Sequence, residues 1–130
     1  MTAVDTNVLV RIVTRDNKEQ AARAAAFLDE QERIFLAKTV LLEVEWVLRS
    51  TYKYARAEVL SALRAFVSLS NAEIEDADAV VQAIEWYEQG LDFADGLHIA
   101  SAGHQHTFAS FDAALQRAAL RLGLSGVISP

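Results

Sequence analysis

Short apolar segments alternate with longer segments of helical character along the chain. The short ones, too brief for helices, are residues 3–4, 34–37, 107–110 and 126–128. The longer ones combine helix-forming residues with apolar positions three and four apart, and they span residues 18–30, 39–51, 56–69, 76–88, 92–104 and 112–122. Because neighbouring parallel strands need crossover connections, this alternation predicts an α/β fold, a three-layer sandwich in which helices flank a short central parallel sheet.

Two of these helices carry signals beyond their periodicity. Thr39 is placed to cap the helix over 39–51. The helix over 56–69 repeats apolar residues at helical spacing, and the preceding helix carries Trp46. Together these two helices predict a partner surface larger than a monomer needs.

The composition describes one folded unit. Of the 130 residues 52% are hydrophobic, and the one Pro and five Gly form no linker, so residues 1–130 are expected to form a single domain. No apolar run approaches the roughly 20 residues that cross a bilayer, and no secretory pattern follows Met1. With no cysteine, disulfide and thiolate chemistry are excluded, and the cytoplasm is the expected compartment.

Charge is distributed unevenly around a net value of -6. No Lys or Arg lies between Arg64 and Arg117, a stretch that contains nine Asp and Glu residues. Six of these acids are expected to form a solvated face: Glu73, Glu75, Asp76, Asp78, Glu85 and Glu88. Asp95 and Asp112 are not assigned to this face, because Asp95 precedes an apolar run in its helix and Asp112 follows a predicted strand and opens a helix.

Asp5 and Asp112 both follow predicted strands. Because ligands of parallel sheets bind beyond the carboxyl ends of the strands, the two acids are expected at one edge. Asp5 lies between Val4 and Val8, where a carboxylate would be partly desolvated and would need compensation. Each acid is either a helix N-cap, a metal ligand, or both.

Glu43 shares a helical face with Val40, Val44 and Val47, which predicts a carboxylate in an apolar stripe. Such a carboxylate calls for a metal or for a distant basic partner, for example Lys38. Its neighbour Glu45 has Arg49 four residues on and is interpreted as one half of an ordinary surface pair.

Asp92 and Asp95 fit the N-cap and the third position of one helix. Asp95 precedes an apolar run, so a second role as a ligand is compatible with its place in the first turn. His98, in the same helix, is expected in the core or at a partner contact. His98, His104 and His106 match no zinc-binding pattern.

Acids that converge without Lys or Arg repel one another, and a hard divalent cation relieves that repulsion. Mg²⁺ prefers oxygen ligands and takes only one or two protein carboxylates directly, so four acids suit one or two ions. Such an ion can activate a water molecule, orient a phosphate and stabilise the leaving oxygen, as phosphodiester cleavage requires.

Over essentially its whole length, the chain resembles the PIN-domain family, specifically the VapC-type toxins of toxin-antitoxin pairs. The order and spacing of four segments carry the resemblance: Val4-Asp5-Thr6-Asn7-Val8-Leu9, Leu42-Glu43-Val44, Phe93-Ala94-Asp95-Gly96-Leu97-His98-Ile99-Ala100 and Thr107-Phe108-Ala109-Ser110-Phe111-Asp112. One departure is Gly96, where Ala is common in the family, and it puts no catalytic role in doubt.

The resemblance implies an Mg²⁺-dependent endoribonuclease, with Mn²⁺ as the alternative metal. Its four acids would be Asp5, Glu43, Asp95 and Asp112. Asp5 and Asp95 would bind the metal directly, and Glu43 and Asp112 directly or through water. The residues that would support the acids are Thr6, Asn7 and Ser110. The resemblance further implies an RNA substrate, a homodimer, and inhibition by a cognate antitoxin protein that wraps the helical pair and blocks the acidic groove.

An acidic enzyme that cleaves a polyanion needs local positive charge, because phosphate contacts supply most nucleic-acid affinity. Arg11, Arg15 and Lys18 follow the Asp5 segment and are the candidate RNA-binding residues, with ordinary solvated charges as the alternative.

Two other functions compete with the nuclease. A phosphotransfer receiver domain is disfavoured, because it would need a Lys beyond a late strand and no Lys follows Lys53. A catalytically inactive PIN-like binding module stays open.

Overall fold

Five short strands and seven helices form the chain in a computed structural model that describes residues 1–130. In chain order they are β1 (Thr2–Ala3), α1 (Thr6–Thr14), α2 (Lys18–Glu30), β2 (Ile34–Leu36), α3 (Lys38–Ser50), α4 (Arg56–Val67), β3 (Ala72–Ile74), α5 (Ala77–Glu88), α6 (Phe93–Ala102), β4 (Phe108–Ala109), α7 (Ala113–Arg121) and β5 (Val127–Ile128). These elements fall into two compact units, Met1–Ala77 and Asp78–Pro130, each described below by itself.

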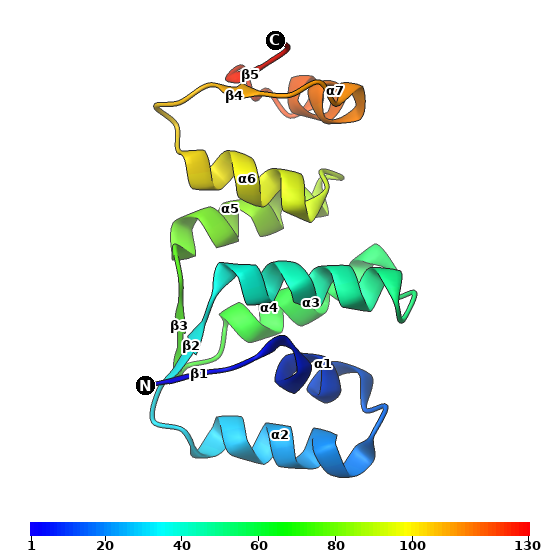
Figure 1. Cartoon of the computed structure of the whole chain (residues 1–130), viewed down its shortest axis with the longest axis vertical. Helices are drawn as coiled ribbons and strands as arrows, with labels where there is room; N and C mark the ends of the chain where they lie inside the picture. Colours follow the sequence, from blue (N-terminus) through cyan, green and yellow to red (C-terminus); the bar gives the residue numbers. More distant parts are fainter. The chain divides into compact units, whose positions relative to one another are not determined.

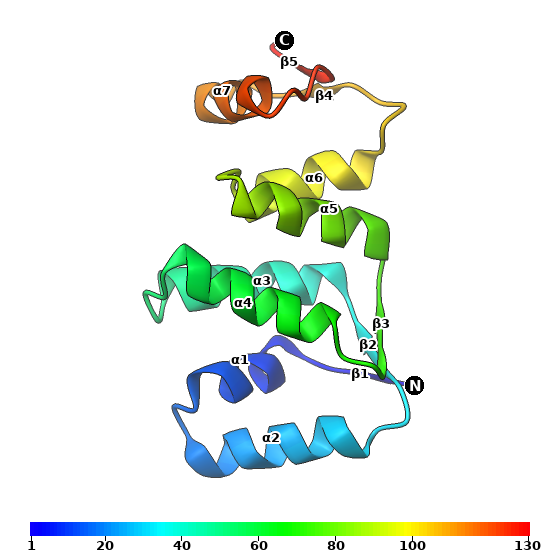
Figure 2. The ribbon, with the colours of Figure 1, turned by 180° about the vertical axis from the view of Figure 1, so that it is seen from behind.

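The first unit contains a three-stranded parallel sheet in the order β1-β2-β3. The central strand β2 pairs Phe35 with Ala3 on one side and with Glu73 on the other. Figures 1 and 2 show α1 between α2 and the pair formed by α3 and α4. Ile34 and Leu36 of β2 are fully buried, as expected for the central strand of a parallel sheet.

The second unit combines α5, α6 and α7 with the parallel pair β4-β5. Helices α5 and α6 approach closely at Gly96, where an added Cβ would lie 3.5 Å from the Cα of Ala83. Tyr87 and Phe93 reinforce this packing through an edge-to-face ring contact with centroids 5.9 Å apart. The first turn of α6, which carries Asp95, is therefore held in place by packing against α5.

The predicted α/β class, with parallel strands joined through helices, is confirmed. The helix over 18–30 matches α2, and the other predicted helices agree with α3 to α7 within two residues at each end. The sequence reasoning missed two elements as such. Helix α1 begins at Thr6, directly after Asp5, where the sequence indicated a helix only through the N-cap alternative for Asp5. Strand β3 lies within the stretch that was interpreted only as a solvated acidic face.

The Thr39 cap was wrong. Helix α3 begins one residue earlier, at Lys38, and its N-cap Ala37 offers no side-chain hydrogen bond. The carboxylate of Glu75 accepts a hydrogen bond from the backbone N–H of Lys38 at 2.9 Å instead. A residue just beyond β3 thus caps the helix that follows β2.

The predicted spare surface on 56–69 was also wrong. Val59 and Leu63 are fully buried and Phe66 is 5% exposed, so α4 uses its apolar face inside the molecule. Trp46 on α3 remains 54% exposed. None of the helices combines the length and apolar character that a membrane span requires.

Candidate active site

Asp5 and Glu43 both lie beside Thr6. Asp5 is the N-cap of α1, and its Oδ1 accepts a hydrogen bond from the backbone N–H of Thr6 at 2.8 Å. The buried Thr6 hydroxyl donates a hydrogen bond to Oε1 of Glu43 on α3. The end of β1 and the middle of α3 thus bring two of the four predicted acids to one residue. Asp5 itself is exposed, so the expected partial desolvation by Val4 and Val8 was wrong.

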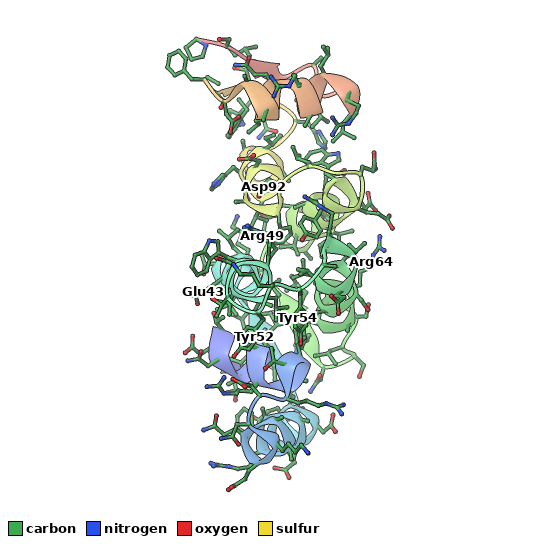
Figure 3. All side chains as sticks on the ribbon, turned by 90° about the vertical axis from the view of Figure 1, so that its right-hand side faces the viewer. Glu43, Arg49, Tyr52, Tyr54, Arg64 and Asp92 are labelled. Carbon is green, nitrogen blue, oxygen red and sulfur yellow. The ribbon has the colours of Figure 1, made fainter.

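The environment of Glu43 also differs from the prediction. Helix α3 buries Leu41, Val44, Glu45 and Leu48, a stripe at offsets of three and four that excludes Glu43. Glu43 is exposed, and it lies on α3 in Figure 3. Its partner is Thr6, whereas the ammonium of Lys38 pairs with Asp76 at 2.9 Å.

Glu45 is the buried acid of this helix. Its side chain is 1% exposed, and its Oε2 lies 2.7 Å from Nε of Arg49. The pair interpreted as an ordinary surface contact therefore has its acidic end in the core. Because a buried carboxylate needs such compensation, Glu45 serves the fold, and Glu43 is left available to solvent.

In the second unit, three acids occupy two helix starts. Asp92 caps α6, as predicted, and its Oδ2 accepts a hydrogen bond from the backbone N–H of Asp95 at 3.1 Å. Asp112 caps α7, and its Oδ1 accepts from the N–H groups of Ala114 at 2.9 Å and Leu115 at 3.2 Å. The hydroxyl oxygen of Ser110 accepts from the N–H of Asp112 at 3.0 Å and so supports that cap.

Asp95 lies in an environment that disfavours its charged form. Partial burial raises its pKa, and the negative charges of Asp92 and Asp112 raise it further, while His98 opposes them. His98 is exposed, which excludes the core position and leaves the partner contact as the remaining expectation. Asp95 thus lies in a negative local field that favours either a proton or a cation.

The donor chemistry suits a hard divalent cation, because every predicted ligand is a carboxylate and no cysteine is present. The first unit contributes Asp5 and Glu43, and the second contributes Asp95 and Asp112. No three His, Asp or Glu side chains lie together closely enough to form a metal site in the structure. The structure therefore places the four acids in two pairs, one in each unit.

A groove of about 550 Å³ opens between α1 and α2. Its walls are formed by Asn7, Val8, Arg11, Gln20, Arg23, Ala24 and Phe27. Of the predicted RNA-binding residues only Arg11 lines it. Arg15 ends α1 in a left-handed conformation with φ 52°, and Lys18 is exposed at the start of α2.

Sequence reasoning missed Arg23 and Phe27 as groove residues. A signal was present, because four residues of α2 share one face: the first and the last each lie three and four residues from the middle two. They are Gln20, Arg23, Ala24 and Phe27. Asn7, expected as a supporting residue of the acids, lies in the groove wall directly after Thr6.

Comparison with known families gives one match. The PIN-domain model matches residues 2–120 and so spans both units and all four acids. Neither the curated proteins nor the solved structures contain a significant match to the chain.

Proposed function

Because the chain belongs to the PIN-domain family, whose members are generally metal-dependent nucleases, we propose that it is an endoribonuclease that depends on Mg²⁺, with Mn²⁺ as a substitute. We further propose that Asp5, Glu43, Asp95 and Asp112 act together in this reaction. The match over residues 2–120 supports treating residues 1–130 as one PIN domain, although the chain divides into two compact units.

The observation that carries this proposal is the way three of the acids are held. The cap bonds of Asp5 and Asp112 use Oδ1 of each, and Thr6 binds Oε1 of Glu43. Each of these carboxylates therefore keeps its second oxygen free of protein hydrogen bonds. Capping and ligand roles do not compete here, because one oxygen fixes the side chain and the other can face a cation.

The chain's own groups then have distinct roles. Asp5 and Asp95 would bind the cation directly, and Glu43 and Asp112 directly or through water. Thr6 orients Glu43, Ser110 supports the backbone of Asp112, and Asn7 borders the adjacent groove. A divalent cation held by these acids would activate a water molecule, orient the RNA phosphate and stabilise charge on the leaving oxygen.

The cellular role we propose is that of a toxin in a toxin-antitoxin pair, active in the cytoplasm as a homodimer and inhibited by a cognate antitoxin. The resemblance of the chain to VapC-type toxins supports this role. The alternative is an inactive PIN-like binding module. The carboxylate oxygens that accept no protein hydrogen bond favour the enzyme, because they are available to a cation. A binding module would not need carboxylates held in this way.

Incubation of the purified protein with a mixed RNA pool tests the nuclease. We expect defined cleavage products with Mg²⁺, none with excess EDTA, and recovery when Mg²⁺ is restored, because no Ser, Cys or His constellation offers a metal-free route. The matched control is Asp29→Asn, which neutralises an exposed acid of α2 outside the site and should cleave normally. Undiminished cleavage in excess EDTA, or intact RNA in every condition, would contradict the proposal.

A further inference from the structure

The groove between α1 and α2 is positively charged, although the chain carries a net charge of -6. Arg11 and Arg23 line it, and no acidic residue does. The side chain of Arg23 takes part in no ion pair or hydrogen bond. A guanidinium that lines a groove and has no acidic partner can bind a phosphate without first breaking an ion pair.

Arg11 is held in place by neighbouring polar groups. Its Nε donates a hydrogen bond to Oε1 of Gln20 at 2.8 Å, and its Nη1 donates to the hydroxyl of Tyr52 at 3.4 Å. Tyr52, which follows α3 in Figure 3, donates in turn to Asp16 at 3.1 Å. Asp16 lies 4.0 Å from Arg11 and is 61% exposed, so it neutralises Arg11 only weakly. The guanidinium is thus held in a fixed orientation, and Asp16 offsets its positive potential only slightly.

Phe27 adds an aromatic surface to the same groove. It is 40% exposed and lies one helical turn after Arg23 on the groove face of α2. Nucleotides of a single strand offer both a phosphate for a guanidinium and a base face for an aromatic ring. A duplex buries its base faces in the stack, so it would leave Phe27 unused.

The groove extends to the first turn of α1 at Asn7. Asn7 forms part of its wall and directly follows Thr6, which binds Asp5 and Glu43. We propose that this groove binds a single-stranded segment of the RNA substrate, with Arg11 and Arg23 on its phosphates and Phe27 stacked on a base. The inference rests on the proposed function and adds the residues that guide the strand. Two guanidinium groups in the walls favour a polyanion over an apolar protein helix as the occupant.

Binding without cleavage tests this assignment. The full chain is titrated in EDTA into a fluorescently labelled single-stranded RNA of about 12 nucleotides, and anisotropy gives the Kd at several salt concentrations. Arg23→Gln should weaken binding about fivefold or more and lower the salt dependence by about 0.7 in log Kd per log salt, the value for one phosphate contact on a single strand. Phe27→Leu should weaken binding about fivefold or more with an unchanged salt dependence, because stacking involves no counterion release.

Arg33→Gln is the matched control. It removes one Arg at the amino end of β2, outside the groove, where Arg33 forms an exposed pair with Glu73, and its affinity should stay within about twofold of wild type. Melting curves should be unchanged for Arg23→Gln and Phe27→Leu, since both side chains are exposed. A duplex of the same sequence should bind more weakly and be insensitive to Phe27→Leu.

Wild-type affinity in both groove variants would overturn the inference and leave the groove to a protein partner. If wild type cleaves RNA while both variants bind it normally, only the groove assignment fails. If wild type binds through Arg23 and Phe27 but cleaves nothing with Mg²⁺, only the nuclease fails. If wild type binds no RNA, both fail.

Discussion

At the scale of single residues, a helix cap and a metal ligand can be the same side chain. In Asp5 and in Asp112, one carboxylate oxygen accepts hydrogen bonds from the backbone of the following helix. These bonds fix the position of each carboxylate just beyond a strand. The sequence left each acid as a cap, a ligand or both, because spacing alone does not say how many oxygens a cap uses. The structure shows one oxygen of each engaged, so both roles are compatible.

Asp95→Asn separates these roles in the second unit. The pKa of Asp95 lies above its ordinary value of 3.8, because burial and two neighbouring carboxylates disfavour its charged form. Its ionisation therefore costs stability once the pH exceeds both the unfolded and the folded pKa, and costs none below both. In metal-free protein we expect Asp95→Asn to be more stable than wild type at neutral pH and equal at low pH. Cleavage with Mg²⁺ should fall by orders of magnitude.

Denaturant titrations at the two pH extremes measure this difference, and Asp92→Asn provides the control. Asn caps helices about as well as Asp, so Asp92→Asn keeps the cap while removing one neighbouring charge. The pKa of Asp95, followed by NMR of its carboxyl carbon, should then shift downwards. An Asp95→Asn protein that cleaves normally and gains no stability at neutral pH would exclude Asp95 from the site.

At the scale of elements, α3 shows why the fold was easier to predict than the environment of its acids. Two stripes at offsets of three and four run along this helix, one through Glu43 and one through Glu45, and both contain apolar residues. The helix buries the stripe that contains Leu41 and Leu48. That choice depends on tertiary packing, which periodicity within one helix does not encode.

Strand β3 and the cap of α3 were not predicted, because both depend on tertiary contacts. The sequence Ala-Glu-Ile is too short and too acidic to identify as a strand, and it forms one because β2 offers an unpaired edge. Glu75, just beyond it, then reaches the N–H of Lys38, which is 37 residues away. Lys18–Glu30, by contrast, was predicted to the residue, because an Ala-rich run of helix formers needs no outside partner.

Arg49→Met tests the separation of the two acids on α3. It removes a partner of a carboxylate that is 1% exposed, so we expect a loss of about 2–3 kcal/mol in the free energy of unfolding, measured by urea denaturation. RNA cleavage per folded molecule should be unchanged. Glu43→Gln should do the reverse, with cleavage lost and stability nearly intact, because Glu43 is exposed.

Arg33→Met is the control for losing an Arg from an ion pair. Arg33 and Glu73 are both exposed and lie 3.1 Å apart, so breaking their pair should cost less than about 1 kcal/mol. An Arg49→Met protein as stable as Arg33→Met would mean that Glu45 does not depend on this pair.

At the scale of the whole molecule, the distribution of charge along the sequence corresponds to different binding groups in the two units. The stretch without Lys or Arg from 65 to 116 contains Asp95 and Asp112, whereas the groove with Arg11 and Arg23 lies in the first unit. The order of the acid motifs along the chain gave the family, which the match over residues 2–120 confirms. What spacing could not give was the groove, because it depends on how two helices pack.

The last prediction concerns whether acids of the two units serve one cation site, and it uses the stability that Mg²⁺ adds. At about ten times its dissociation constant, Mg²⁺ should stabilise wild type by roughly 1.4 kcal/mol, a rise of several degrees in Tm. Asp5→Asn and Asp95→Asn each preserve helix geometry while removing a ligand charge. If both acids hold the same ion, each single variant should lose most of the shift and the double variant should lose no more, since one site cannot be lost twice.

Asp29→Asn, exposed on α2 and outside the site, should retain the full shift. Partial losses in the two single variants that sum in the double variant would instead show independent ions, and a full shift in both would remove Asp5 and Asp95 from metal binding altogether.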